Sequence, residues 1–578
     1  MRAPYVCCLV FLAACSLVAV SATSFAQAPG ERSAIYQIDC DRDCLIGLTR
    51  GYMEALAKKD PARAQFATNV RFTENNVELT AGRDGLWRTI TGVAANGLEA
   101  ADPTTGQAAW IGTVEENGSP VYYGMRLRIE AKKISEVETI VVRRTGLPLP
   151  FGDVRKLVHD PSFNEVMPPE ERRPRERLLA VADSYFSTVE LNDGMVFAPF
   201  TDDCARIENG IVTTRAGAGS SGDIAQGCED QFKLGIYRIN KRIRERRYRL
   251  IDEERGVVVA TGFFDHANTF DTYKTTDGKE RKTLLKWPNS ISLVEAFKIR
   301  DGRIYRIEAV FTYVPYFMHS PFASAPPIQA SKATTATKAS DCDRACLIQH
   351  ADRYMEALVK RDPSGLPWAT TVRFTENSVP MMIGDGTWGS IRGQATKALS
   401  AADPTTGNVV WLGRVNDHDL PAFYAMRLRV QGGRITEVDT VVARKGNPGP
   451  FGDPARFEVD PAFDEVLNGS RLSRSRLQSI VERAEPGTQR RENGVQLTRT
   501  PDVPERVRAV RFPVIDTERG IVVTQGFADF PADGRRPQAD PYPNARETFE
   551  IFKVRNDRIE RVEALSIFQA YGMPSPWP

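Results

Sequence analysis

Helical spacing of apolar residues marks the first structured segment of the chain. Leu45, Leu48, Tyr52 and Leu56 recur every three to four residues, and an Asp-Pro pair at residues 60–61 ends the pattern. The spacing predicts a helix of about four turns.

Alternating apolar and polar residues predict strands over much of the remaining chain. In YYGMRLRIE, residues 122–130, every second residue from Tyr123 to Ile129 is apolar, and ISEVETIVVRR from Ile134 pairs with it across a turn. A second helix is predicted over residues 175–191, followed by YRLI, GVVVATGFF and FKIRDGRIYRIEAVF as long strands. The pattern therefore predicts a helix followed by antiparallel strands, used twice.

A duplication accounts for the same pattern in the second half. VRFTEN stands at residues 70–75 and 372–377, ADPTTG at 101–106 and 402–407, and PFGD at 150–153 and 450–453, so the offset between copies is 302, 301 and then 300 residues. Further on, LIDEERGVVV matches VIDTERGIVV at an offset of 264, and FKIRDGRI matches FKVRNDRI at an offset of 255. The second copy has therefore lost segments in its later half.

The helix, the strands and the terminal hairpin F-K-x-R-D-G-R-I-x-x-I-E-A resemble the cone-shaped fold of the nuclear-transport-factor-2-like and SnoaL-like superfamily. The resemblance implies an α+β fold of tandem cone-shaped domains, each with a curved antiparallel sheet packed on N-terminal helices. The motifs CDRxCL, YMEALxxxDP and RFTEN and the endings YVPYFMHSPF and AYGMPSPW resemble a secreted bacterial and fungal family of unknown function. That family implies no activity.

The duplication and this resemblance predict four cones in two copies. The expected segments are a signal peptide at residues 1–26, cone 1 at 40–165, cone 2 at 175–324, a linker at 325–340, cone 3 at 341–466, and a reduced cone 4 at 471–578. The linker APPIQASKATTATKAS is small, polar and Pro-bearing, which favours a flexible connection.

The N-terminus reads as an export signal. Arg2 precedes an apolar run over residues 6–20, and the small-residue site Ser24-Phe25-Ala26 follows. We expect cleavage after Ala26 and a periplasmic or extracellular protein. The alternative is a lipoprotein anchored at Cys15, which follows Leu-Ala-Ala. No later stretch is apolar for long enough to span a membrane.

Export would leave six cysteines in an oxidising compartment, which favours disulfides. The loss of the counterparts of both Cys204 and Cys228 from the second copy favours a bond between them, although a coincident deletion is the alternative. Each copy keeps a CxxxC motif, so the other expected pairs are Cys40 with Cys44 and Cys342 with Cys346. Since residues four apart in a helix are poorly aimed for a bond, each helix should begin after its first cysteine. A metal site is not expected, because two thiols without nearby His or Cys make half a zinc site.

Charge and motifs exclude several function classes. The 76 basic and 74 acidic residues leave a net charge of +2, so no nucleic-acid partner is implied. A basic run, RINKRIRERRYR at residues 238–249, is expected to be a solvated strand face or a charged sheet edge. Phosphate-loop, dinucleotide and G-x-S-x-G patterns are absent, so no cofactor is expected.

VRFTEN supplies the candidate chemistry. If Val70 and Phe72 face inward, Glu74 points the same way into a mostly apolar cavity, where burial would raise the pKa of its carboxyl for acid/base work. The expected lining is Trp87, Trp110 and Tyr123, with Glu376, Trp388, Trp411 and Tyr424 in the second copy. The alternative is structural: Glu74 pairs with an arginine such as Arg126 or Arg128, and the aromatic residues form core.

A second candidate is the pair Asp265 and His266. Adjacent strand residues point to opposite faces, so they cannot form a dyad directly. The second copy has Asp529 and Phe530 at these positions, so a histidine mechanism would operate in one copy only.

Two functions follow from these patterns. One is binding of a small, fairly apolar molecule in the cone pockets, with Glu74 and Glu376 as the acid/base groups of an isomerase, dehydratase or cyclase. The other is a non-catalytic exported scaffold whose cones stack on each other or on a partner.

Overall fold

The computed structural model describes residues 40–144, 150–215, 222–283, 286–323, 342–394, 398–446, 450–467, 469, 471–484, 490–497, 502–536 and 540–577. The expected signal peptide, the lipidation site at Cys15 and the expected linker lie outside these residues. Among the residues described, no helix is both long and apolar enough to cross a membrane.

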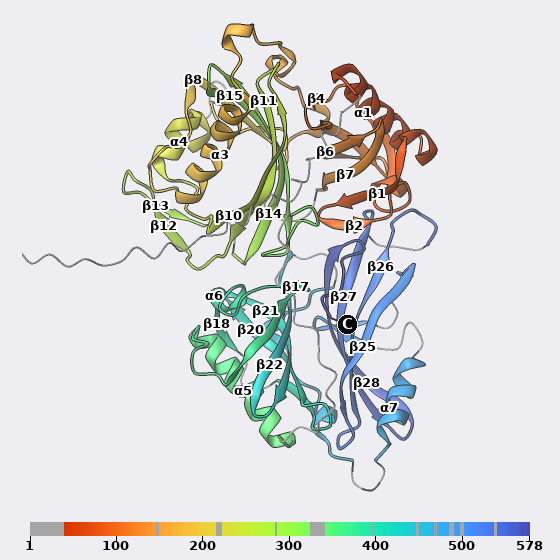
Figure 1. Ribbon diagram of the computed structural model, residues 1–578. Helices are drawn as coiled ribbons and strands as arrows, with labels where there is room; N and C mark the ends of the chain where they lie inside the picture. The colour runs from red at the N-terminus through yellow and green to blue at the C-terminus, as the bar shows by residue number, and fades with distance from the viewer. Residues whose placement is uncertain are drawn as a thin grey trace, which may run out of the picture. The chain divides into compact units, whose positions relative to one another are not determined.

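The first sheet has seven strands and carries a helix on one face (Figure 1). Its order is β2 (Val77–Leu79), β1 (Phe66–Glu74), β7 (Lys133–Val142), β6 (Ser119–Glu130), β5 (Gln107–Glu116) and β3 (Ile90–Val93), with β4 (Leu98–Asp102) also on β5. The helices are α1 (Arg42–Ala57) and the short α2 (Leu86–Thr89).

The second sheet has six strands and two helices, one long and one short. Its order is β10 (Arg242–Asp252), β11 (Val257–His266), β14 (Asn289–Arg300), β15 (Arg303–Val314), β8 (Phe200–Glu208) and β9 (Ile211–Val212). The helices are α3 (Arg175–Leu191) and α4 (Cys228–Leu234), and a separate hairpin joins β12 (Thr272–Lys274) to β13 (Glu280–Lys282).

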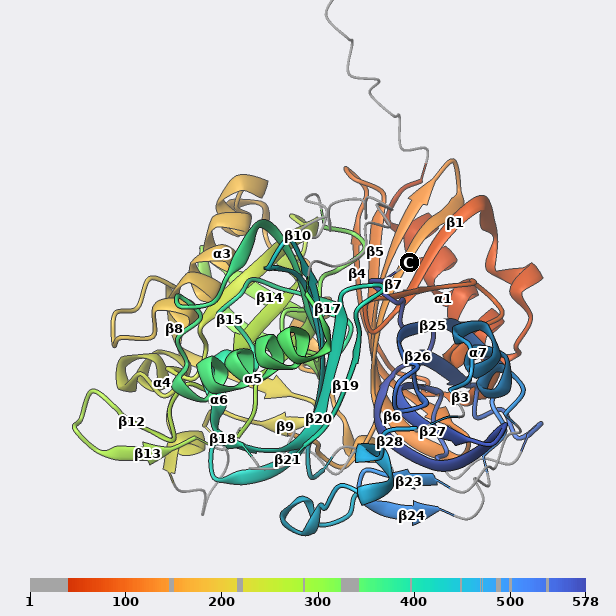
Figure 2. The same cartoon turned by 90° about the horizontal axis from the view of Figure 1, so that it is seen from below.

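The second copy repeats both sheets. The third has the order β17 (Val379–Pro380), β16 (Trp368–Glu376), β22 (Arg434–Ala443), β21 (Leu420–Gln431), β20 (Asn408–Asp417) and β18 (Ile391–Gln394), with β19 (Leu399–Asp403) on β20 and the helices α5 (Arg344–Lys360) and α6 (Thr387–Ser390). The fourth has the order β24 (Val495–Leu497), β23 (Arg490–Glu492), β28 (Arg558–Ala570), β27 (Asn544–Arg555), β26 (Ile521–Phe530) and β25 (Arg506–Asp516), with the helix α7 (Arg474–Glu482). Figure 2 shows α5 lying across the third sheet. Short 3-10 turns connect these elements at Pro61–Ala64, Val154–Lys156, Pro161–Asn164, Pro169–Glu171, Gly222–Ala225, Pro454–Arg456 and Pro461–Asp464.

The sheets are mixed, which corrects the expectation of purely antiparallel ones. β1 runs parallel to β7, β8 to β15, β16 to β22 and β23 to β28. Parallel neighbours need a long connection, and here the other strands of each sheet provide it. The four domain limits drawn from the sequence stay a prediction.

Among the described residues there are three disulfides: Cys40–Cys44, Cys204–Cys228 and Cys342–Cys346. The side chain of Asp41 caps α1 by accepting from the backbone N of Cys44 at 2.9 Å, so Cys40 precedes the helix, as predicted. Asp343 caps α5 through Cys346 in the same way. Disulfides are typical of proteins that fold in an oxidising environment.

Each sheet buries one face under its helices and the other face against the next sheet. In the first copy, Ile111 and Tyr122 of the first sheet share a core cluster with Val257 and Val294 of the second. The third and fourth sheets pack in the same way. A further cluster joins the interior of the third sheet to Phe263 of β11, so both copies form one continuous packed unit.

Candidate functional site

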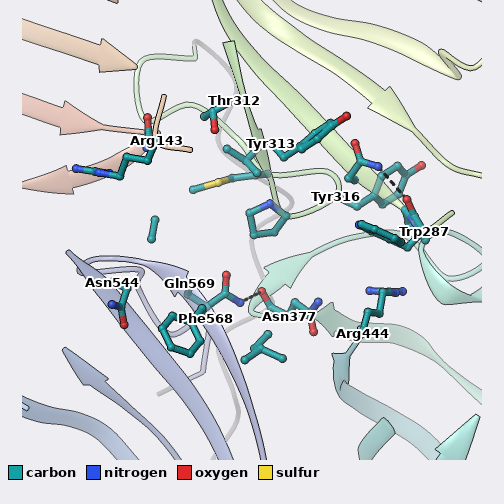
Figure 3. Close-up of a pocket in the computed structure, with 18 of the residues that line it drawn as sticks. Arg143, Trp287, Thr312, Tyr313, Tyr316, Asn377, Arg444, Asn544, Phe568 and Gln569 are labelled. Atoms are coloured by element: carbon teal, nitrogen blue, oxygen red, sulfur yellow. Dashed lines mark hydrogen bonds between the residues drawn. The ribbon is translucent and has the colours of Figure 1, made fainter. Parts of the chain in front are cut away.

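A cavity of about 260 Å³ lies where strand ends from all four sheets meet (Figure 3). We call it the central chamber. Its polar wall residues include Asn75, Arg143, Asn289, Thr312, Tyr313, Tyr316, Glu376, Asn377, Arg444, Asp540, Asn544 and Gln569. Its apolar wall includes Val141, Met318, Met381, Ile567 and Phe568. Such a mixture of apolar walls and a few polar groups is typical of small-molecule sites.

The duplication places equivalent residues on the wall twice. The equivalent pairs are Asn75 and Asn377, Arg143 and Arg444, Trp287 and Tyr542, Asn289 and Asn544, and Tyr313 and Phe568. In Figure 3 the labelled side chains enter the chamber from four differently coloured parts of the chain. The two VRFTEN strands therefore end at one shared chamber.

In the first copy, two carboxylates bind Nη2 and Nε of Arg143. Its Nη2 donates to Oε1 of Glu74 at 2.7 Å and to Oε1 of Glu116 at 2.9 Å, and its Nε donates to Oε2 of Glu116 at 2.7 Å. Burial opposes the charge on Arg143, but the two carboxylates outweigh it and raise its pKa. Oε2 of Glu74 accepts from the backbone N of Leu86 at 2.7 Å, so both oxygens of Glu74 are occupied. The arginine that pairs with Glu74 is Arg143. The expected partners Arg126 and Arg128 do not pair with it; Arg126 instead pairs with Glu136 and Glu138.

The second copy has a shorter carboxylate at the same place. Asp417 replaces Glu116, and its Oδ2 accepts only from Nε of Arg444, at 2.5 Å. Nη2 of Arg444 lies 3.9 Å from Oε1 of Glu376 and makes no hydrogen bond with any described residue, although the residue is only 7% exposed. Oδ1 of Asp417 and Oγ of Ser390 are also buried without described partners, whereas the equivalent Oε1 of Glu116 accepts from the hydroxyl of Thr89 in the first copy. With the shorter Asp417, Nη2 of Arg444 has no hydrogen bond to a described residue and keeps only the longer ion-pair contact with Glu376.

Glu376 lines the chamber and is 3% exposed. Its Oε2 accepts from the backbone N and the hydroxyl of Thr387, at 2.9 and 2.6 Å. Burial raises the pKa of Glu376 above its usual range, although Arg444 and Thr387 act against the shift.

A second difference between the copies concerns the two chamber asparagines. Oδ1 of Asn289 contacts Nδ1 of His266 at 3.0 Å, and Nε2 of His266 contacts Oδ1 of Asn240 at 2.8 Å. His266 is therefore a buried link behind the wall, and burial lowers its pKa. Phe530 stands at the equivalent position in the second copy, so Oδ1 of Asn544 has no described partner, while its Nδ2 donates to the backbone O of Tyr542 at 3.0 Å.

The other predicted residues lie in core or at outer grooves. Trp87 packs edge-on against Tyr52 with ring centroids 5.5 Å apart, and burial raises the pKa of Tyr123 in the same interior. Trp388 and Tyr424 occupy the matching interior of the second copy. Trp110 and Trp411 line outer grooves of about 840 and 680 Å³ beside α1 and α5.

Asp265 forms ion pairs with two arginines of the basic run at residues 238–249. Oδ2 of Asp265 accepts from Nε of Arg242 at 2.7 Å and of Arg244 at 2.8 Å, and its Oδ1 accepts from the hydroxyl of Ser290. Most of the run lies on β10, which is an edge strand of its sheet. Of the two expectations, the charged sheet edge therefore fits the structure. Its arginines are not simply solvated, because Arg247 also pairs with Glu138 of the first sheet.

Sequence reasoning missed the chamber arginines and asparagines. Asn75 and Asn377 belong to VRFTEN, and Arg143 and Arg444 follow the matching strands IVV and VVA, so the repeat itself carried the signal. What was missing was the knowledge that these strand ends meet.

A possible metal cluster in the described chain does not fit a metal ion. The ligand atoms of Cys342, Cys346 and His350 lie within 4.8 Å of one another, but the two sulfur atoms are bonded to each other. The group therefore offers one free ligand, which is too few for zinc.

The sequence pattern of the family described as Domain of unknown function (DUF8021) matches residues 171–311, 340–442 and 470–566, which together make up more than half of the chain. The protein belongs to this family. A search of curated proteins finds no match to this DUF8021 protein. Among solved structures, it is similar to an NTF2-like protein of unknown function from Cytophaga hutchinsonii, with 11% identity, a TM-score of 0.15 and coverage of 17% of this chain and 88% of the other. It is also similar to a protein from Sphaerobacter thermophilus, with 16% identity, a TM-score of 0.14 and coverage of 17% and 96%. Membership in a family of unknown function is thus confirmed, while the particular motifs CDRxCL, RFTEN and the two endings stay a prediction.

Proposed function

We propose that this DUF8021 protein is exported and binds one small, largely apolar molecule in the central chamber. The observation that carries the proposal is the convergence of equivalent polar residues from four sheets on a single cavity. This location differs from the expected pockets inside each cone, whose interiors are filled by Trp87, Trp388 and their neighbours. Disulfides support the export part of the proposal.

The test is native mass spectrometry of the mature protein from an exporting host, compared with the denatured sample. A mass excess that disappears on denaturation is expected. Thr312→Trp, which fills the chamber from β15, should remove the excess. The matched control Thr272→Trp adds the same ring to an exposed position on β12 and should keep it. An excess retained equally in both variants would place the ligand elsewhere, and no excess in any sample would favour the scaffold function.

Acid/base catalysis is a second candidate function, supported by Glu376 specifically. This carboxyl lines the chamber with a raised pKa, as a general acid requires. Glu74 is less suited, because both its oxygens are occupied. If Glu376 is catalytic, Glu376→Gln should retain the recovered ligand but stop its conversion, while Glu78→Gln, an exposed change on β2, should leave conversion intact. Equal conversion by both variants would remove Glu376 as the acid.

A further inference from the structure

The two CxxxC disulfides are equivalent in position but differ in one neighbouring side chain. Cys40–Cys44 and Cys342–Cys346 each tie the residue before a helix cap to the first turn of the helix, in α1 and α5. In both pairs the first cysteine is buried and the second is partly exposed. His350 of α5 stands at the position of Leu48 in α1, and each of these side chains is 9% exposed. The second copy therefore has an imidazole where the first has an aliphatic side chain.

His350 lies beside both sulfur atoms of its disulfide. One ring nitrogen of His350 and the Sγ atoms of Cys342 and Cys346 all lie within 4.8 Å of one another. Nδ1 of His350 is buried and makes no hydrogen bond with a described residue, which is costly for a polar atom and is not explained by packing. Burial, with the charge of Arg353, lowers the pKa of His350. The imidazole is therefore neutral near pH 7 and able to accept a proton.

The helix N-terminus does not distinguish the two disulfides. Backbone N–H groups at the start of a helix stabilise a thiolate, but in α5 the carboxylate of Asp343 accepts from the backbone N of Cys346 at 2.9 Å. Asp41 accepts from the backbone N of Cys44 at the same distance in α1. Because the two caps are alike, the chemical difference next to the sulfur atoms is His350.

We propose that Cys342–Cys346 is an exchange-active disulfide that oxidises low-molecular-weight thiols, and that His350 relays the proton. The sulfur of the incoming thiol bonds to Sγ of Cys346, the partly exposed cysteine, while the thiol proton passes to the imidazole. The electron pair of the broken S–S bond leaves on Sγ of Cys342, which takes the proton back from the imidazolium.

A second thiol completes the reaction. It attacks the outer sulfur of the mixed disulfide, and Cys346 leaves as a thiol. Two thiols are thus oxidised to one small disulfide, and the cysteine pair gains two electrons and two protons. None of the three residues lines the central chamber, so this activity is independent of the proposed binding function.

The test compares the disulfides of one protein in one reaction. Protein from an exporting host is treated with excess reduced glutathione, thiols are alkylated at intervals, and peptide mass spectrometry measures the reduction of each pair. Cys342–Cys346 should be reduced at least about tenfold faster than Cys40–Cys44, because a positioned base accelerates proton transfer. Cys204–Cys228, in which both residues are 1% exposed, should stay intact and reports unfolding.

Reciprocal variants exchange the one side chain that differs. His350→Leu gives the second copy the residue of the first, and should bring the rate at Cys342–Cys346 to within about twofold of that at Cys40–Cys44. Leu48→His makes the opposite change and should accelerate reduction of Cys40–Cys44. If His350→Leu also exposes Cys204–Cys228 to reduction, the variant has unfolded and Leu48→His decides the matter.

Two controls separate a proton relay from a looser helix. Asp43→Ala removes the other difference within the motif, since Ala345 stands at that exposed position in the second copy, and should change the rate at Cys40–Cys44 by less than about twofold. Without a base, the rate follows the thiolate fraction of glutathione and rises about tenfold per pH unit. Reduction of Cys342–Cys346 should rise less steeply than this between about pH 6 and 8, and His350→Leu should restore the full slope.

Three results would overturn the proposal. Equal rates at the two CxxxC pairs of the wild-type protein would show that the second pair is not exchange-active. A fast second pair whose rate is unchanged in His350→Leu would remove the imidazole from the reaction. A slower His350→Leu variant with the same pH slope as the wild type would show that His350 only shapes the helix.

Discussion

Shortening Glu116 to Asp should destabilise the first sheet, because the second copy already displays the result of that change. Glu116 accepts three hydrogen bonds: one from the hydroxyl of Thr89 at 2.6 Å and two from Arg143 at 2.7 and 2.9 Å. Asp417 keeps one, to Nε of Arg444. Glu116→Asp should therefore lose two bonds to a buried charged group. At about 1.5 kcal/mol each, the free energy of unfolding should fall by about 3 kcal/mol.

The assay is urea unfolding followed by hydrogen-exchange mass spectrometry, read for peptides of β5 and β7. A loss of about 3 kcal/mol should lower the urea midpoint of these peptides by about 1 M or more. Glu115→Asp is the matched control. The carboxylate of Glu115 is about half exposed, and its ion pair with Arg155 spans 3.9 Å. That control should change stability by less than about 0.5 kcal/mol. If both variants unfold together with the wild type, the buried carboxylate network does not stabilise the sheet.

Three further changes test other parts of the structure. Replacing both Cys204 and Cys228 with Ser should lower the free energy of unfolding by about 3.5 kcal/mol by the chain-entropy relation, because their loop spans 24 residues. The same change at Cys40 and Cys44, whose loop spans 4 residues, should lower it by about 2 kcal/mol. Equal losses in thermal unfolding would contradict this order. Burial, with the nearby charge of Glu208, raises the pKa of Glu295 to about 8, above its value of 4.5 in the unfolded chain. The contribution of Glu295 to the free energy of unfolding is therefore complete below pH 4.5. It should fall by about 1.4 kcal/mol per pH unit as the pH rises toward 8. Glu295→Gln should remove this slope from pH-dependent unfolding curves, the exposed Glu280→Gln should keep it, and an identical slope in both would exclude Glu295 as its source. Gly210→Ala should destabilise the protein by at least about 1 kcal/mol more than Gly118→Ala in the same measurement. Both glycines have positive φ, +75° and +77°, so the backbone strain is similar. A Cβ at residue 210 would lie 2.0 Å from the hydroxyl of Tyr122, whereas a Cβ at residue 118 would have no atom within 4 Å.

Local patterns determined much of the architecture. The spacing of Leu45, Leu48 and Tyr52 predicts α1, and alternation in residues 122–130 predicts β6, because side chains on one face recur with a fixed period in a helix and in a strand. The disulfides followed from comparing the two copies of the chain. The direction of one strand pair in each sheet did not follow, because β1 and β7 are separated in the chain by β2 to β6 and no local pattern relates them.

The candidate site was predictable only in part. Alternation in VRFTEN pointed Glu74 and Glu376 inward, and both are buried. Their partners Arg143 and Arg444 could not be identified, because they lie about 70 residues along the chain and no local period relates the two positions.

The sequence by itself determined the repeat, the long helices α1 and α3, several long strands and the cysteine pairs, since each depends on spacing within a segment or on comparison of two segments. Only the tertiary structure decided that both copies share one chamber, with walls drawn from residues as distant as Asn75 and Ala570. It also decided that the change from Glu116 to Asp417 matters. In sequence that change removes one methylene, but in the folded core it leaves Nη2 of Arg444 without a described hydrogen-bond partner, because buried groups have no bulk water to replace a lost contact.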